Sequence, residues 1–378
     1  MAGSRDIVEG YDLQFLPPDR APDQLAGLRI LVLGLGSHGG GTELIHFLHS
    51  HGAQISISEH SSEQQMSESL KKLKDIPIHK TTFDGHRLED LENCDWVVVN
   101  PAIKPSTPFL EKIARSDVRA VTELGLALSW LPARYLAAVT GTNGKSTTCE
   151  LTRRMLEESG IHTVAGGNLG GSLLGELDRE NPDRRYIVEI SSFQAERLGS
   201  ATSRPGIVSV TNLSPDHIDW HGDKAHYYAA KKSLLESSRG EIDLAILPTT
   251  GPMGRDYNCP NRKVIRCGID GRDGESRPAK NSTGKPVLYI ISPEKERCIS
   301  YRPSNALEGD AGLENVLHAA TIAVHLGASD DGIEKAIEEF EGLPHRYQYL
   351  GEFHGIRFID DSKATSPESA MAALNRTG

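Results

Sequence analysis

Long apolar runs, paired cysteines and an excess of positive charge are all absent from this 378-residue sequence. No stretch approaches the roughly 20 apolar residues that a membrane-spanning helix requires, and the opening MAGSRDIVEGYDLQ lacks the apolar core of a secretory signal. The five cysteines form no CxxC pair and no zinc-like spacing, which predicts reduced thiols. With 41 basic and 52 acidic residues, nonspecific nucleic-acid binding is not expected. These absences predict a cytoplasmic protein with neither a membrane nor a nucleic-acid partner.

Short β-rich runs alternate with helical patterns along most of the chain. The first part holds LRILVL (28–33), QISISE (54–59) and WVVVNPA (96–102), and the alternation restarts at Tyr135 with YLAAVT. This order predicts an α/β fold built on parallel sheets covered on both faces. Residues 271–286 are polar and rich in Gly, Pro and Ser, which predicts an exposed loop. Helical spacing at 314–327 and 330–342 predicts two amphipathic helices, and two short strands are expected at 347–353 and 356–361.

A glycine-rich loop, GTNGKST (141–147), stands between the run YLAAVT and a helical pattern. Such a loop turns backbone N–H groups toward a phosphate, and the helix N-terminus adds its positive end. Gly141 and Gly144 allow the tight curl, Lys145 would bridge the β- and γ-phosphates, and the Ser146 hydroxyl would bind Mg²⁺. The sequence therefore predicts an ATP site; an ordinary Gly/Asn turn before a helix is the alternative.

A second glycine loop follows the first strand. Gly34, Gly36 and Gly39 fit G-x-G-x-x-G, and Glu59 ends the next strand, which is the fingerprint of a dinucleotide-binding fold. Taken alone it suggests an NAD-dependent dehydrogenase. Any nucleoside diphosphate could use the same helix N-terminus, and a βα turn without a ligand also fits.

Further polar residues follow the later strands. Glu189 lies near the carboxyl end of the strand RYIVEI, where an open α/β sheet places a Mg²⁺-holding acid; a solvated strand end is the alternative. The stretch TNLSPDHIDWH offers either a metal site or a polar loop, and Lys231 in HYYAAKKSLLES is by itself most simply a solvated lysine.

Taken in order, the motifs GTNGKST, GGNLG, EISSFQ, NLSPDHIDWHG, YYAAKKS, LENVLHAA, LPHRYQ and DDSKAT resemble the Mur ligases. The resemblance runs from about residue 25 to the end, and SSFQ, LPHR and DSKAT favour the D-glutamate-adding branch. It implies a Rossmann-like domain for the UDP-substrate (1–132), a central ATP-binding domain (133–343) and the beginning of a C-terminal α/β ligase domain (344–378).

The implied reaction consumes ATP with Mg²⁺. It activates the carboxylate of UDP-N-acetylmuramoyl-L-alanine as an acyl phosphate, which the amine of D-glutamate then attacks. A monomer is expected.

The resemblance also implies a set of site residues. Catalytic roles fall to Lys145, His217 and Lys231, with Lys231 matching the lysine that the family carbamylates. Metal ligands would be Ser146, Glu189, His217 and Lys231. The residues implied for ATP are Gly141, Thr142, Asn143, Gly144, Lys145, Ser146, Thr147, Asn315, Arg346 and Asp361. Those implied for the two substrates are Gly36, Ser37, Asn100, Asn168, Ser191, Lys363 and Thr365.

Two departures from the family pattern stand out. NPAIKP places Asn100 where the family uses serine, and the stretch Glu59, His60, Ser61 offers no arginine for the diphosphate. Family members continue beyond DSKAT, so a shortened chain with weak or no activity is expected, and Ile356, Phe358 and Ile359 would be exposed. The alternatives are another Mur or folylpolyglutamate-type ligase, or a non-catalytic nucleotide-binding module.

Overall fold

The computed structural model describes residues 13, 15–36, 40–104, 107–177, 183–198, 205–236, 243–364, 370–371 and 373–374. Two compact units emerge from its contacts. The first comprises Met1–Leu131, Gly170–Arg179 and Phe193–Ser203, and the second comprises Pro132–Leu169, Glu180–Ser192 and Arg204–Gly378. The three-domain division at 132 and 343 stays a prediction. In the described part, no helix has the length and apolar character needed to cross a bilayer.

The first unit is built on a five-stranded parallel sheet of order β3-β2-β1-β4-β5. Its strands are β1 (Arg29–Leu33), β2 (Gln54–Ser58), β3 (Ile78–Thr82), β4 (Trp96–Val99) and β5 (Arg119–Val121). The connecting helices are α1 (Gly40–Ser50), α2 (Ser67–Lys72), α3 (Pro108–Ala114) and α4 (Glu123–Trp130). This confirms the Rossmann-like expectation, because the strand order is that of the first five strands of the doubly wound order 3-2-1-4-5-6.

The second unit holds a six-stranded parallel sheet of order β11-β10-β9-β6-β8-β7. The strands are β6 (Leu136–Thr140), β7 (Thr163–Gly167), β8 (Arg185–Glu189), β9 (Ile207–Val210), β10 (Leu244–Pro248) and β11 (Lys263–Cys267). Every residue of β6 and β9 is buried, as continuous apolar strands at the centre of a parallel sheet should be. Thr140, Glu189 and Val210 therefore end three adjacent strands at one edge.

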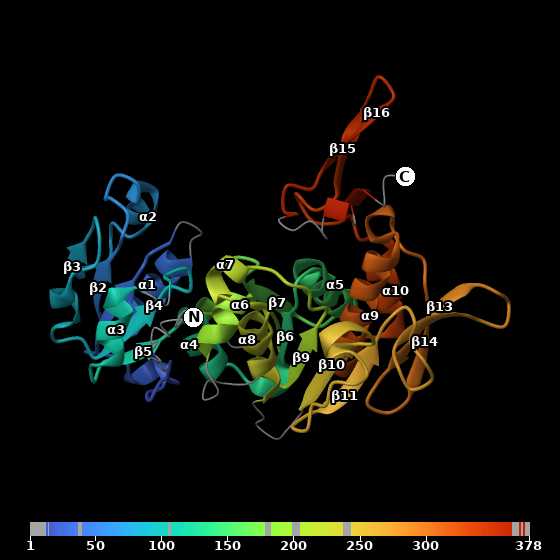
Figure 1. The fold of residues 1–378 in the computed structure, drawn as a ribbon, viewed down its shortest axis with the longest axis horizontal. Helices are drawn as coiled ribbons and strands as arrows, with labels where there is room; N and C mark the ends of the chain where they lie inside the picture. Colours follow the sequence, from blue (N-terminus) through green and yellow to red (C-terminus); the bar gives the residue numbers. More distant parts are fainter. Residues whose placement is uncertain are drawn as a thin grey trace, which may run out of the picture. The chain divides into compact units, whose positions relative to one another are not determined.

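Three helices gather beside this sheet: α5 (Lys145–Glu158), α9 (Asp310–His325) and α10 (Asp330–Glu338). Helix α5 contacts both α9 and α10, and α9 contacts β9, β10 and β11 (Figure 1). Their buried faces form one apolar cluster with the strands. The second unit also holds α7 (Ile218–His221) and α8 (Lys224–Glu236), whereas all of α6 (Ser192–Leu198) except its first residue belongs to the first unit. Short 3₁₀ helices lie at Pro22–Gln24, Leu88–Leu91, Ala133–Tyr135, Leu174–Glu176, Gly251–Met253 and Asn305–Leu307.

The loop expected at 271–286 is partly wrong. Strand β12 (Arg277–Lys280) lies within it and pairs antiparallel with β13 (Pro286–Ile291), which in turn pairs with β14 (Glu296–Ser300). The sequence RPAK has no strand-like pattern of its own. Its extended form comes from pairing with β13, whose Val287, Leu288 and Ile290 are buried.

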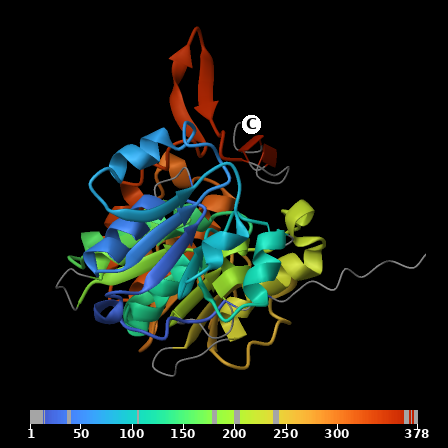
Figure 2. The ribbon, with the colours of Figure 1, turned by 90° about the vertical axis from the view of Figure 1, so that its left-hand side faces the viewer.

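The last described elements form a hairpin, β15 (Gln348–Phe353) and β16 (Ile356–Asp360), whose antiparallel strands are visible in Figure 2. Its apolar side chains stay in solvent: Phe353 is 67% exposed and Ile356 61% exposed. Phe358 is 51% exposed, as expected, whereas Ile359 is half-buried.

One buried polar pair links α9 to the sheet. His318 is 2% exposed, and its Nδ1 lies 2.9 Å from the hydroxyl of Ser209 in β9. Burial lowers the pKa of His318 to about 4, because a charged ring would lose its hydration there. The folded state therefore holds the neutral ring.

This pair predicts a pH dependence of stability. The unfolded His318 takes up a proton below its ordinary pKa of about 6.5, whereas the folded one does not until about pH 4. The contribution of the neutral His318 to the free energy of unfolding is therefore fully present above about pH 6.5 and is lost as the pH falls toward about 4. When the pH is lowered from about 7.5 to about 5, the free energy of unfolding of the unchanged chain should fall. We expect that of His318→Asn to fall by about 2 kcal/mol less. Urea unfolding at both pH values measures this, with exposed His162→Asn as the control. Equal losses in the unchanged chain and in His318→Asn would contradict it.

Candidate active site

The central glycine loop connects β6 to α5 at the carboxyl edge of the six-stranded sheet. Gly141 has φ +143° and Gly144 has φ +81°, conformations that favour glycine. Both also lack room for a side chain. A Cβ at Gly141 would lie 2.0 Å from Thr211 Oγ1, and one at Gly144 would lie 2.1 Å from Asn315 Oδ1. The two glycines therefore let the loop lie against its neighbours.

Residues that follow β9 hold the loop in place. The Asn212 carbonyl accepts from Thr142 N–H at 3.0 Å, and its side-chain oxygen accepts from Asn143 N–H at 2.9 Å. The Thr211 hydroxyl donates to the Asn143 carbonyl at 2.6 Å. Because β9 lies beside β6 in the sheet, the end of one strand fixes the loop after the other.

Thr142 forms a second anchor. Its hydroxyl donates to the Ser214 carbonyl, accepts from Ser214 N–H, and lies 3.0 Å from the phenol oxygen of Tyr227. Tyr227 is fully buried in α8. Helix α8 is thereby tied to the glycine loop.

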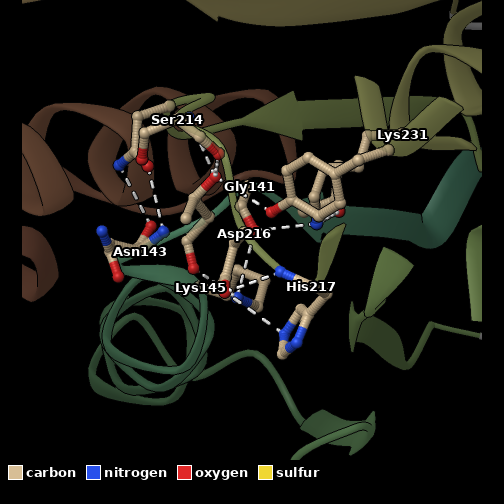
Figure 3. A network of polar contacts seen from close by, with 11 residues as sticks. Gly141, Asn143, Lys145, Ser214, Asp216, His217 and Lys231 are labelled. Atoms are coloured by element: carbon tan, nitrogen blue, oxygen red, sulfur yellow. Dashed lines mark hydrogen bonds and ion pairs between the residues drawn. The ribbon is translucent and has the colours of Figure 1, made fainter. Parts of the chain in front are cut away.

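Two lysines donate to the same loop carbonyl. Lys145 Nζ lies 3.0 Å from Gly141 O and 2.8 Å from Thr142 O, and Lys231 Nζ lies 2.9 Å from Gly141 O (Figure 3). Burial lowers the pKa of Lys145, and Arg346 acts in the same direction while Glu189 opposes it. The loop thus carries a concentration of positive charge.

Lys231 is not the solvated lysine that its helix alone suggests. It is 2% exposed, and its ammonium lies 5.0 Å from the centre of the Tyr227 ring. Burial lowers its pKa well below the usual value, with Lys145 adding to the shift and Asp216 and Glu189 opposing it.

The carboxylate of Glu189 is buried, and only one of its two oxygens accepts a hydrogen bond from the described residues. The side chain is 1% exposed, and Oε1 accepts from Asn168 Nδ2 at 2.7 Å. Oε2 is buried and has no hydrogen-bond partner in the part of the chain that the structure describes, an arrangement that is costly unless a ligand or cation satisfies it. Ser191 follows two residues later and is half-buried. The solvated strand-end alternative for Glu189 therefore does not describe this carboxylate.

The turn that precedes the hairpin also contributes residues to the site. Arg346 Nη2 donates to Ser146 Oγ at 2.8 Å. His345 and Tyr347, on either side of it, have φ +63° and +46°, which is uncommon outside glycine. Asp361 Oδ1 accepts from Tyr347 N–H at 2.9 Å, so Arg346, Asp361 and the phosphate loop lie together.

Four further predicted residues belong to this unit, and two of them lie next to the glycine loop. Asn315 in α9 faces Gly144 and accepts from Thr148 Oγ1 at 3.4 Å. Thr147 is half-buried in the first turn of α5. The side chain of Lys363 is exposed, and its N–H donates to the His345 carbonyl at 3.1 Å. Thr365 lies outside the described residues.

His217 directly precedes α7 as its N-terminal cap residue, with φ +51°. Its N–H donates to Asp216 Oδ1 at 2.9 Å, and its Nε2 lies 3.5 Å from Asp216 Oδ2. Among the described residues no three His, Cys, Asp or Glu side chains gather as a metal cluster. Glu189 and Ser146 instead offer separate oxygen ligands, a sparse set that suits Mg²⁺ completed by phosphates and water.

In the first unit, Gly36 and Asn100 lie together. Asn100 Nδ2 donates to Gly34 O at 3.2 Å, and a Cβ at Gly36 would lie 2.8 Å from the same nitrogen. Glu59 is already used by backbone groups, accepting from Leu35 N–H at 2.7 Å and Ser61 N–H at 3.0 Å. Although burial raises its pKa, these N–H donors bring it below the usual value. Ser37 lies outside the described residues.

Sequence reasoning missed the residues that position the loop. Thr211, Asn212 and Tyr227 make its most direct contacts. A signal was available for the first two, since they directly follow a buried strand that parallel pairing places next to β6. Nothing in the sequence points to Tyr227, because its role depends on how α8 packs.

Two family descriptions match this chain. "Mur ligase middle domain" matches residues 139–323, and "Mur ligase MurD-like, N-terminal domain" matches residues 28–122. The UDP-N-acetylmuramoylalanine--D-glutamate ligase of Roseiflexus sp. (strain RS-1) is 32% identical over 93% of this chain and 76% of that relative. The enzyme of the same name from Koribacter versatilis (strain Ellin345) is 31% identical over 92% of this chain and 75% of that relative.

Solved structures share the fold. A UDP-N-acetylmuramate:L-alanyl-gamma-D-glutamyl-meso-diaminopimelate ligase from Neisseria meningitides has a TM-score of 0.57 and 18% identity, covering 84% of this chain and 99% of that one. UDP-N-acetylmuramate-alanine ligase MurC from Thermotoga maritima has a TM-score of 0.56 and 19% identity, covering 93% of this chain and 77% of that one.

The crowding at Gly141 predicts a specific loss. In Gly141→Ala the new methyl group would meet Thr211 Oγ1 at 2.0 Å, so the loop must shift. We expect ATP affinity to fall by at least about tenfold, since phosphate cradling depends on exact backbone placement. Titration of the chain with a fluorescent ATP analogue measures the affinity.

Gly160→Ala is the matched control. Gly160 also has positive φ, at the end of α5, but a Cβ there would find open space. It should cost about 1 kcal/mol of stability and leave ATP affinity unchanged. Equal ATP affinity in the two variants would refute the close-packing argument.

Proposed function

The chain belongs to the Mur ligase family, and from that membership we propose the assignment of its site. The protein is an ATP-dependent ligase that joins D-glutamate to UDP-N-acetylmuramoylalanine in peptidoglycan synthesis. The observation that carries this is the 32% identity to a ligase of that name over 93% of the chain. The glycine loop and the buried carboxylate beside it supply the parts that such a reaction needs.

The chemistry requires two anions to meet. The substrate carboxylate attacks the γ-phosphorus of ATP, the bond to ADP breaks, and an acyl phosphate forms. The amine of D-glutamate then attacks the acyl carbon, and phosphate leaves as the amide forms. Positive charge at the point of attack lowers the barrier by offsetting this repulsion.

Lys145 is the cation that we assign to the phosphates. At rest its ammonium is held by the carbonyls of Gly141 and Thr142. A phosphate oxygen is a stronger acceptor for a charged donor than a neutral carbonyl. Lys145 would therefore exchange these carbonyls for the γ-phosphate, with Arg346 approaching from the hairpin turn.

The residues present fit a magnesium ion. Glu189 Oε2 is buried at the end of β8 without a hydrogen-bond partner among the described residues, and Ser146 lies in the first turn of α5, directly after the glycine loop. We assign Mg²⁺ to these two groups, with His217 and Lys231 assigned to a second ion. A bound Mg²⁺ supplies charge stabilisation to the phosphates. Asn168 keeps Glu189 in place through its 2.7 Å hydrogen bond and retains a second N–H for substrate.

For Lys231 we propose carbamylation, following the family resemblance. The ammonium first loses one proton, and the neutral amine then adds to CO₂ and loses a second, so that a cation becomes a carbamate anion. That change would remove the repulsion between Lys231 and Lys145, which now share the Gly141 carbonyl.

The other assignments remain part of the same proposal. Gly36, Ser37 and Asn100 would bind the UDP end, Asn168 and Ser191 the reacting end, and Lys363 and Thr365 the D-glutamate carboxylates. Asn315 and Asp361 are assigned to ATP. We also propose domains at 1–132, 133–343 and 344–378, a monomeric state and a cytoplasmic location.

Amino-acid selectivity tests the assigned reaction. With ATP, Mg²⁺ and UDP-N-acetylmuramoyl-L-alanine, we expect ADP release beyond one equivalent per protein only when D-glutamate is added, because without an amine the reaction stops once the acyl phosphate and its one equivalent of ADP have formed. A panel containing L-alanine, L-lysine, meso-diaminopimelate and L-glutamate provides the controls. If one of these supports release and D-glutamate does not, the D-glutamate assignment fails.

Magnesium dependence tests the role of Glu189. Glu189→Gln keeps an oxygen for Asn168 but removes the negative charge. We expect the Mg²⁺ concentration for half-maximal ADP release to rise at least about tenfold, since Mg²⁺ prefers charged oxygen ligands. Glu158→Gln, at the far end of α5, is the matched control and should leave it unchanged. An unchanged Mg²⁺ requirement in Glu189→Gln would remove Glu189 from the metal site.

A further inference from the structure

A buried arginine lies beside the first glycine loop, and no motif singled it out. Arg197 of α6 is 3% exposed. Its guanidinium lies 5.5 Å from the centre of the Phe15 ring. Burial lowers its pKa to about 10, which still leaves it charged at neutral pH. A buried charge is unfavourable unless its donors are satisfied, so its hydrogen bonds identify what it stabilises.

Both guanidinium contacts fall on one short turn. Nη1 donates to the Asn100 carbonyl at 3.2 Å, and Nη2 donates to the Ile103 carbonyl. The same turn is closed by Ile103 N–H, which donates to the Asn100 carbonyl at 3.1 Å. Two parallel donors on a rigid plane suit two carbonyls of one turn, a geometry that arginine supplies and lysine does not.

This turn packs directly onto the glycine loop. Asn100 Nδ2 donates to the Gly34 carbonyl at 3.2 Å, and Asn100 N–H donates to the Leu33 carbonyl at 2.9 Å. A Cβ at Gly34 would lie 2.9 Å from Asn100 Cβ. A displacement of the turn would therefore displace the loop.

We propose that Arg197 is a positioning residue for the nucleotide end of the substrate. It fixes the turn 100–103, and the turn in turn sets the backbone of Gly34 and Gly36. This rests on the proposed binding of the UDP end by that loop. The guanidinium acts on substrate binding indirectly, by holding Asn100, and is not itself assigned a contact with the substrate.

The test compares Arg197→Met with Arg197→Lys. We expect Arg197→Met to weaken UDP binding, measured by calorimetry with UDP alone, by about tenfold, as for loss of hydrogen bonds to a charged donor. The KM for UDP-N-acetylmuramoyl-L-alanine should rise in proportion, while kcat at saturation and the affinity for ATP stay within twofold. Arg197→Lys should recover part of the UDP affinity, because it restores one charged donor.

Arg119→Met is the matched control. Arg119 is also an arginine of the first unit that donates to a backbone carbonyl, that of Pro17, at 2.7 Å. It should leave UDP affinity unchanged. If Arg197→Met binds UDP as tightly as the unchanged chain, or if ATP affinity falls equally, the positioning role is overturned. If the unchanged chain binds UDP but forms no amide, the proposed ligation fails while the role of Arg197 stands.

Discussion

The site depends on one carbonyl oxygen. Gly141 O accepts from both Lys145 and Lys231, so two lysine side chains, whose pKa values burial lowers, meet at the carboxyl end of a central strand. The carbonyl, the Tyr227 ring and the nearby carboxylates offset the repulsion between them. A binding pocket for a polyanion must hold such charge before the anion arrives, and this loop does so with the backbone itself.

The parallel sheet explains why the partners assemble there. Strands β6, β8 and β9 are adjacent and run the same way, so the residues that follow them reach one edge. The glycine loop, Glu189 with its unshared oxygen, and the Thr211–Asn212 clamp are therefore neighbours despite wide separation in sequence. The first sheet repeats the arrangement, with Gly34 after β1 and Asn100 after β4 bonded to each other.

The local sequence was sufficient to predict those site residues that belong to one contiguous motif. The glycines at 141 and 144, Lys145 and the strand-end Glu189 could be placed from spacing, because a strand, a tight loop and a helix leave few alternatives. It was insufficient where a contact joins distant segments. Arg346 reaching Ser146 and α8 burying Tyr227 arise from packing, and β12 is a strand only because β13 pairs with it. Lys231 shows both sides: its helix alone suggests a solvated side chain, and only the family resemblance indicated a role for it at the site.

The turn around Arg346 has a further consequence. The left-handed backbone conformations of His345 and Tyr347 are each about 1 to 3 kcal/mol less favourable than an ordinary backbone conformation. Two neighbouring acids offset that cost: Asp360 lies 2.6 Å from the His345 ring nitrogen, and Asp361 accepts from Tyr347 N–H. The arginine is thus aimed by carboxylates that follow it by some fifteen residues. Substitutions at these two acids can consequently change the position of the Arg346 guanidinium without changing Arg346 itself or the glycine loop beside it.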